Sequence, residues 1–437
     1  MFRIIKPADG RLDELLQHRS VDLQRVDERV KEIIDTVRHG GDDGLCQLIA
    51  GLDGVRLTPS QIKVREEEIR AAYQQVNEDF LAALRAAAQN ITRYHRRQLR
   101  NSWLDAQDDG TVLGQLITPL HRVGIYVPGG KASYPSSVLM NAIPAAVAGV
   151  EEIVMATPPD RSGQINPHTL VAAAEAGVRE IYRAGGAHAV AALAFGTETI
   201  SRVDKIVGPG NIYVTAAKRR VFGTVDIDML AGPSEVLVVA DDSADPALVA
   251  ADMLAQAEHD EMASAWLVTP SVQLAAGVQG ELVRQLPSLV RRAVAEKSIR
   301  ERGAAIITET LEEAVDIANY IAPEHLELLV PDPCRWLGRI RNAGAVFLGH
   351  FSPEPVGDYL AGPNHVLPTG GTARFFSPLG VDAFVKKTSI IGYSPQALAR
   401  HGKHIVTLAM TEGLDAHAKS VQLRMSLHGV APGESTR

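Results

Sequence analysis

Apolar positions in the first hundred residues recur at helical spacing. The segment Val21–Val37 places its apolar residues on one helical face, at Leu23, Val26, Val30, Ile33, Ile34 and Val37. The pair Gly40–Gly41 is typical of a helix end. A second helical region, capped at Thr58 or Ser60, continues to about Leu99. We therefore expect the first hundred residues to be helical.

From about Arg122 the pattern changes to short β-rich runs that alternate with alanine-rich helical runs. The first series predicts strands at Val123–Val127, Ile153–Thr157, Glu180–Arg183, Lys205–Val207 and Val236–Ala240, with helices at Ser137–Ala148, His168–Ala176, Ala187–Ala194 and Ile212–Val221. A second series predicts strands at Ala265–Thr269, Ala304–Thr308, Leu326–Val330 and Ala345–Leu348. Such alternation is typical of parallel, doubly wound sheets.

The two series predict an α/β protein with two Rossmann-like doubly wound units, a helical N-terminal region and a small helical C-terminal tail domain. We expect an N-terminal arm over 1–22, a first Rossmann-like domain from 23–121 plus 239–380, a second over 122–238, and a tail over 381–437. The N-terminal helices are expected to pack on the domain built around 239–380. The tail, with helices at Pro395–His401 and Ile405–Arg424, is too short and polar to hold its own core. It should dock on its own body or on a partner chain.

The composition removes several classes of protein. Of 437 residues, 44 are Lys or Arg and 52 are Asp or Glu, a net charge of −8, which provides no attraction to nucleic acid or to an anionic membrane. A hydrophobic content of 46% excludes disorder as the main state. Only Cys46 and Cys334 are present, which excludes a disulfide framework and an all-thiolate zinc site. We expect a cytoplasmic protein, because no secretory signal or membrane span is visible.

Two glycine-rich turns follow predicted strands. Val127–Gly130 and Gly208–Asn211 stand where a doubly wound sheet presents its ligand crevice. Glycine allows backbone N–H groups to approach a phosphate, and a helix N-terminus favours the anion. Neither turn completes the dinucleotide pattern, because Tyr213 stands where the third glycine belongs. Each turn therefore indicates either a nucleotide site or a plain tight turn.

Four polar side chains form a candidate metal set. Gln256 and His259 are three residues apart, so they share a helix face. Asp358 lies in a loop rich in Gly, Asp, Asn and His, and His417 lies in the tail close to Glu412. Nitrogen and oxygen ligands without sulfur suit zinc or manganese. The same segments are also typical of polar helix ends and turns.

Glu324 and His325 form a candidate acid/base pair directly before a predicted strand. Histidine exchanges protons near neutral pH and glutamate can activate water, although an adjacent Glu–His pair is also common on protein surfaces. Nucleophilic catalysis has less support. Ser234 has no triad pattern, and Cys334 has no reactive context.

Seven segments together resemble the histidinol dehydrogenase family. They are VGIYVPGG (123–130), VGPGNIYVTAAK (207–218), VDIDMLAGPSEVLVVAD (225–241), AQAEHD (255–260), APEHLEL (322–328), GDYLAGPNHVLPTGGTARF (357–375) and EGLDAHAKSV (412–421). They occur in family order and cover the chain nearly end to end.

The resemblance implies NAD-dependent oxidation of L-histidinol to L-histidine through the aldehyde, the last step of histidine biosynthesis. It implies one zinc ion per subunit, which holds the substrate. The implied metal ligands are Gln256, His259, Asp358 and His417, and the implied substrate contacts are Ser234, Gln256, His259, His325, Asp358, Glu412 and His417. The implied acid/base residues are Glu324 and His325, and the implied NAD contacts are Tyr126, His188 and Asn211. It also implies a homodimer in which the tail completes the partner's site.

One position departs from the family pattern, and three rival functions compete with the implied one. His188 stands where the family usually has Gln, and imidazole cannot reproduce the hydrogen-bond geometry of an amide. A related dehydrogenase acting on another polar alcohol, such as a sulfonated diol, is disfavoured because Ser234 and Glu412 are both retained. A metal-dependent hydrolase is the second rival, because nitrogen and oxygen ligands can also hold a metal that activates water. A non-catalytic binding scaffold is the third.

Overall fold

The computed structural model describes residues 2–7, 10–17, 19, 22–129 and 133–427. The chain divides into two compact units, Met1–Gln98 with Leu120–Phe384, and Leu99–Pro119 with Val385–Arg437. The first unit holds two parallel sheets and the second an antiparallel ribbon. No helix among the described residues is long and apolar enough to cross a membrane.

The sheet formed between residues 122 and 227 has five parallel strands in the order β6-β5-β4-β7-β8. The strands are β4 (Arg122–Tyr126), β5 (Glu152–Thr157), β6 (Glu180–Arg183), β7 (Lys205–Val207) and β8 (Asp226–Ile227). Alternate residues of β5 enter opposite layers, since Val154 packs with one hydrophobic cluster and Met155 with the other. Apolar layers on both faces explain why these strands have continuous hydrophobic sequences.

The N-terminal helices that follow residue 23 cover this five-stranded sheet, so for them the prediction that they pack on the domain around 239–380 is wrong. Helix α2 packs on α8 and α9, α4 on α7, and α5 on α6. The helices are α2 (Gln24–Leu48), α4 (Glu66–Tyr73), α5 (Glu78–Arg96), α6 (Pro135–Ala148), α7 (Pro167–Glu175), α8 (Gly186–Phe195) and α9 (Ile212–Val221), with the shorter η2 (Ile49–Asp53) and α3 (Pro59–Ile62) between α2 and α4. An apolar stripe predicts a buried helix face but not the sheet that buries it. Within α2, Gly41 leaves the helical conformation at φ 52°, at the predicted Gly40–Gly41 boundary.

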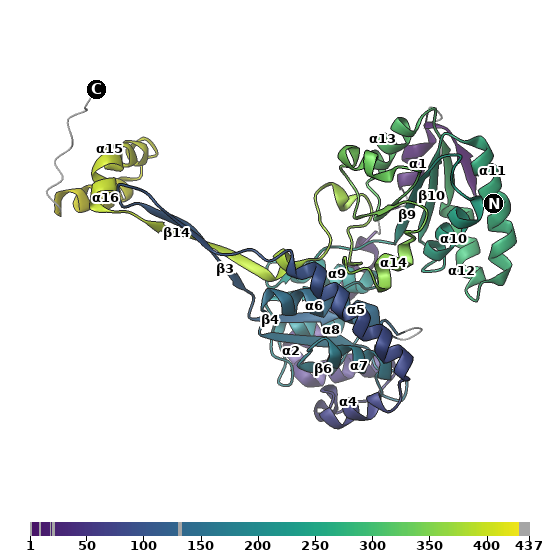
Figure 1. Ribbon diagram of the computed structural model, residues 1–437. Helices are drawn as coiled ribbons and strands as arrows, with labels where there is room; N and C mark the ends of the chain where they lie inside the picture. The colour runs from purple at the N-terminus through teal and green to yellow at the C-terminus, as the bar shows by residue number, and fades with distance from the viewer. Residues whose placement is uncertain (1, 8–9, 18, 20–21, 130–132, 428–437) are drawn as a thin grey trace. The chain divides into compact units, whose positions relative to one another are not determined.

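The second sheet of this unit has six parallel strands in the order β1-β11-β10-β9-β12-β13. The strands are β1 (Arg3–Ile5), β9 (Glu235–Ala240), β10 (Ser264–Thr269), β11 (Ala304–Ile307), β12 (His325–Leu329) and β13 (Ala345–Leu348). Helices α10 (Pro246–Ala257), α11 (Val272–Gln285) and α12 (Arg292–Arg302) cover one face, and α1 (Arg11–Gln17) and α13 (Leu311–Ile321) cover the other (Figure 1). The nine predicted strands are thus confirmed to within one residue at each end, whereas the sequence pattern does not predict β1 or β8.

The remaining short helices of this unit are η3 (Leu286–Ser288), η4 (Pro333–Arg339), α14 (Glu354–Tyr359), η5 (Thr372–Arg374) and η6 (Val381–Phe384).

The second unit is an antiparallel ribbon followed by a helical pair. Strand β3 (Val112–Pro119) pairs with β14 (Val385–Gly392) and β2 (Trp103–Ala106), and α15 (Pro395–Thr411) packs on α16 (Asp415–Leu427). The unit therefore includes residues 99–119, which the sequence pattern places in the first Rossmann-like domain, and α15 continues past the predicted break near His401. Among its described residues, the buried side chains are only Thr111, Ala397, Ala409 and Ala418. The expectation that this region lacks its own core is confirmed.

The turn between β7 and α9 requires glycine at position 208. Gly208 has φ +117°, and a Cβ there would lie 2.1 Å from the Tyr126 carbonyl oxygen. Its N–H donates to Asp228 Oδ2 at 2.8 Å and its carbonyl accepts from Lys218 Nζ at 2.9 Å. The buried Lys218–Asp228 ion pair therefore holds this turn against the end of β4.

We expect Gly208→Ala to destabilise the protein more than Gly223→Ala. Both glycines have positive φ, but only Gly208 is crowded, because a Cβ at Gly223 would meet nothing within 4 Å. Positive φ should cost each variant about 1–2 kcal/mol, and the clash should add about 1–3 kcal/mol at Gly208. Thermal denaturation of the two variants measures the difference. Equal melting temperatures would show that the turn relaxes without cost.

Candidate active site

The predicted acid/base residues lie at the amino end of β12, next to the amino end of β9. Glu324 directly precedes β12, His325 is its first residue, and Ser234 directly precedes β9. The two strands pair in parallel with His325 opposite Val236. Open parallel sheets usually bind ligands at the carboxyl ends of their strands. This site uses the opposite edge, because residues just before each strand supply its side chains.

Glu324 is buried and held by the backbone of Glu235. Its Oε2 accepts the Glu235 N–H at 2.9 Å, and only 5% of the residue is exposed. Burial raises the pKa of Glu324 well above its ordinary value, and the nearby charges of Glu235 and Asp358 raise this pKa further. A carboxyl group with a raised pKa can exchange a proton near neutral pH.

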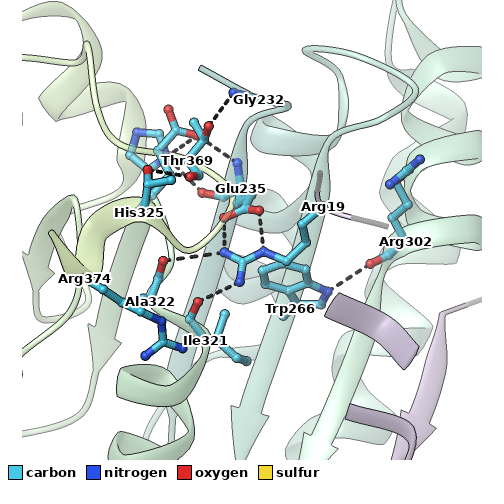
Figure 2. Close-up of polar contacts among 12 residues, drawn as sticks. Arg19, Gly232, Glu235, Trp266, Arg302, Ile321, Ala322, His325, Thr369 and Arg374 are labelled. Atoms are coloured by element: carbon cyan, nitrogen blue, oxygen red, sulfur yellow. Dashed lines mark hydrogen bonds and ion pairs between the residues drawn. The ribbon is translucent and has the colours of Figure 1, made fainter. Parts of the chain in front are cut away.

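His325 is a neutral base with one ring nitrogen unused. Its Nδ1 lies 3.1 Å from the Glu235 carbonyl oxygen (Figure 2), and because a carbonyl only accepts, Nδ1 carries the hydrogen. Burial lowers the pKa of His325 to about 3, so the ring is neutral at pH 7. Nε2 then carries a lone pair, and it has no hydrogen-bond partner among the described residues. The site therefore presents a proton acceptor, with Asp358 Oδ1 3.9 Å away.

A second group of side chains comes from the end of α10 and from α14. Single ligand atoms of His259, Glu354 and Asp358 all lie within 4.8 Å of one another, which suits one metal ion. Gln256 is fully buried, and with its amide nitrogen toward Glu354 it donates to both carboxylate oxygens at 3.1 Å. This orientation leaves the amide oxygen of Gln256 available as a ligand. Glu354 is a site residue that sequence reasoning misses, since nothing in its local sequence separates it from a helix-start glutamate.

Five buried or half-buried carboxyl groups surround these residues. Burial raises the pKa of Asp252 to about 6 and that of Asp358 to about 7. Burial also raises the pKa values of three glutamates, Glu324, Glu327 and Glu354, well above the ordinary value. Carboxylates removed from water are stabilised by a proton or by a cation. The cluster therefore favours cation binding beside the His325 base.

His365 is a further buried side chain at this site. Its Nδ1 lies 3.1 Å from the Asp358 carbonyl oxygen, and its Nε2 lies 3.3 Å from Ser137 Oγ. Burial lowers the pKa of His365 to about 4, so it too is neutral. The sequence places His365 in the same polar loop as Asp358 but indicates no role for it.

The three predicted cofactor residues lie at the carboxyl edge of the five-stranded sheet. Tyr126 ends β4, and its hydroxyl accepts the Gly186 N–H at 3.1 Å. His188 Nε2 lies 2.9 Å from Asp53 Oδ2, while its buried Nδ1 has no partner among the described residues. Asn211 caps α9 by accepting from the N–H of Tyr213 and of Val214. The ring nitrogen Nδ1 of His188 and the glycine-rich turn Gly208–Asn211 are features that could contact a nucleotide. The other predicted turn, Val127–Gly130, includes Gly130, which lies outside the described residues.

The last two predicted residues belong to the second unit. Glu412 directly follows α15 as its C-cap residue and His417 lies in the first turn of α16, and both are exposed. The first unit therefore brings together Gln256, His259 and Asp358 with Ser234, Glu324 and His325, whereas Glu412 and His417 belong to the second unit.

Comparisons with known proteins decide the family. Residues 16–425 match the family model described as histidinol dehydrogenase. The chain belongs to the histidinol dehydrogenase family. A histidinol dehydrogenase of Heliobacterium mobile is 56% identical over 425 residues, which cover 97% of this chain and 100% of that protein. One of Moorella thermoacetica is 58% identical over 396 residues, which cover 91% and 93%.

A crystal structure of histidinol dehydrogenase from Elizabethkingia anophelis is similar over almost the whole chain. It superposes with a TM-score of 0.92 at 38% sequence identity, and the match covers 98% of this chain and 99% of that one. The family resemblance and the α/β fold class predicted from the sequence are both confirmed.

Proposed function

We propose that this protein oxidises L-histidinol to L-histidine through L-histidinaldehyde, with NAD as the oxidant, as the last step of histidine biosynthesis. Membership of the family supports an oxidoreductase of that pathway. The observation that carries the mechanism is the neutral His325 base, with Nε2 unpartnered among the described residues, beside Glu324 and the His259–Glu354–Asp358 cluster. NAD would accept one hydride in each of two half-reactions, and Tyr126, His188 and Asn211 would contact it.

Two residues would handle the protons. In the first half-reaction, Nε2 of His325 accepts the hydroxyl proton as hydride leaves the carbinol carbon. The aldehyde must then be hydrated before a second hydride can leave. Glu324 would take a proton from that water, because burial raises the pKa of its carboxyl group and so makes the ionised form a stronger base.

Gln256, His259 and Asp358, with His417, would hold one zinc ion per subunit. Their amide oxygen, imidazole nitrogens and carboxylate oxygen match the ligands that zinc accepts. Zinc, when bound, would position the substrate and act as a Lewis acid. Ser234 and Glu412 would contact the substrate, as would the four metal ligands and His325.

The homodimer is part of the same proposal. The second unit carries Glu412 and His417 but buries almost no side chains of its own. Its exposed apolar residues include Leu104, Ile391, Leu408, Leu423 and Leu427. Large exposed apolar surface is typical of a protein interface. We infer that a second copy covers it and that each tail completes the site of the other subunit.

The basic activity test is NADH formation by purified protein with zinc, NAD and L-histidinol, compared with a sulfonated diol. Formation of NADH with the diol alone would favour the related dehydrogenase. Hydrolytic activity without NAD would favour a metal-dependent hydrolase, and no turnover at all would favour a binding scaffold.

Metal removal should abolish turnover. Chelation should stop NADH formation, and Zn²⁺ or Mn²⁺ should restore it. His259→Ala should lose bound zinc while it remains folded, because it removes a ligand but no core side chain. His39→Ala, an exposed histidine of α2, is the control and should keep its zinc. Unchanged zinc in His259→Ala by elemental analysis, or full activity in a metal-free sample, decides against the metal site.

Glu324→Gln should separate the two half-reactions. Loss of a general base typically costs about 10²–10⁴-fold, and here it should affect oxidation of the aldehyde while sparing interconversion of alcohol and aldehyde. The variant should therefore still reduce histidinal with NADH. Equal losses in both steps would show that Glu324 only positions His325.

Complementation tests the shared site. His259→Ala and His417→Ala homodimers should each be inactive. If tails cross between subunits, co-expression yields heterodimers with one site carrying both substitutions and one site carrying neither. Random pairing makes half of the dimers mixed, so about a quarter of wild-type activity should return. A silent mixture with heterodimers confirmed by mass would show that the tail acts within its own chain.

A further inference from the structure

Arg19, from the predicted N-terminal arm, is a buried arginine with an unusually full set of partners. Its side chain is 7% exposed. Nε and Nη2 donate to the two carboxylate oxygens of Glu235 at 2.6 and 2.5 Å, and the guanidinium lies 5.2 Å from the ring centre of Trp266. Figure 2 shows this guanidinium between Glu235 and the chain at Ile321 and Ala322. A planar fork of donors is suited to such a bidentate contact.

The residue that Arg19 holds is also the residue that holds both proposed acid/base side chains. The Glu235 N–H donates to Glu324 Oε2 at 2.9 Å. The Glu235 carbonyl accepts from His325 Nδ1 at 3.1 Å, which fixes the tautomer that leaves Nε2 free. Any displacement of Glu235 would therefore move the hydrogen bonds of both groups at once.

The guanidinium of Arg19 also donates hydrogen bonds to backbone carbonyls just before Glu324. Nη1 donates to the Ile321 carbonyl at 2.6 Å, and Nη2 lies 3.5 Å from the Ala322 carbonyl. Ala322 has φ 52°, the one positive φ of a non-glycine residue among those described. Such a conformation costs an alanine free energy unless its surroundings maintain it. Arg19 thus fixes the turn from α13 into β12 as well as the start of β9.

We propose that Arg19 is a positioning residue that places Glu324 and His325 for the reaction, by holding the starts of β9 and β12 together. This inference rests on the proposed function. The position requires arginine, because its planar guanidinium can donate to both oxygens of one carboxylate and also to two backbone carbonyls. The single ammonium group of lysine cannot make all of these hydrogen bonds at once. The pair could not have been found by local pattern, since Arg19 and Glu235 are 216 positions apart.

Arg19→Lys tests the role of this fork while keeping the positive charge beside Glu235. We expect kcat for L-histidinol to fall by about 10²-fold, the loss typical of a small misplacement of reacting groups. The KM for L-histidinol and the zinc content should stay near wild type, because the side chain bonds none of the proposed metal ligands. The melting temperature should fall by a few degrees, because lysine leaves buried acceptors without a donor, but the variant should remain folded at the assay temperature. Arg11→Lys, an exposed arginine of α1, is the matched control and should keep wild-type kcat.

Wild-type kcat in Arg19→Lys overturns the inference, as does a loss that lies wholly in KM or follows loss of zinc or of folding. If wild-type protein itself forms no NADH from L-histidinol, the proposed function fails instead, so the two failures are distinguishable.

Arg19→Met combined with Glu235→Gln provides a second test that does not depend on the folding of Arg19→Lys. This double variant leaves no unpaired buried charge, which is the main reason that breaking a buried ion pair unfolds a protein. The backbone N–H and carbonyl at position 235 remain, but the bidentate contact between residues 19 and 235 is lost. The kcat should therefore again fall by about 10²-fold. A folded double variant with wild-type kcat would show that the ion pair contributes to folding alone.

Discussion

The burial of carboxyl groups at the amino edge of the six-stranded sheet is the constraint on which this site depends. Glu324, Glu354 and Asp358 are withdrawn from water close to one another, and each has a raised pKa. The nearby imidazoles cannot neutralise them, because burial holds the pKa of His325 near 3 and that of His365 near 4. The compensating charge must therefore be a proton or a cation taken from solution. The same burial keeps His325 neutral, so one physical cause favours cation binding and provides a base.

Arg19 neutralises the carboxylate of Glu235, which is not one of the proposed proton-transfer groups. Its guanidinium is bonded to Glu235, whose backbone rather than carboxylate contacts the proposed acid/base pair. This buried permanent cation is thus kept off the reacting groups. Placed against Glu324 instead, it would hold that carboxyl ionised and lower its pKa, which is unfavourable for a residue that must exchange a proton near neutral pH. The arrangement keeps charge compensation for the fold separate from proton transfer at the site.

Local periodicity predicts the nine buried parallel strands, because strands covered on both faces have continuous apolar sequences. It does not predict β1, β8, β2, β3 or β14. Strands β1 and β8 are only three and two residues long and each lies at a sheet edge, and the other three form a ribbon with both faces largely exposed. Sequence patterns also cannot assign α2 and α5 to a sheet, because an apolar stripe does not identify its partner. The seven family segments contain every predicted site residue except His188. Glu235 also lies in one of them, but its contacts, like those of Glu354 and Arg19, are revealed only by the folded chain.

Among its described residues, the second unit buries too few apolar side chains to be stabilised by its own packing. Its ribbon satisfies backbone hydrogen bonds through the eight paired positions of β14 and β3, yet its described residues bury only one threonine and three alanines as side chains. Backbone pairing of that extent contributes little net stability without apolar burial, because water satisfies the same groups in the unfolded chain. Residues such as Trp103, Leu104 and Leu408 supply the missing apolar area, but they lie on the outside. In the proposed homodimer, one surface would both cover these apolar side chains and bring Glu412 and His417 to a site, so the two proposals have the same physical motive.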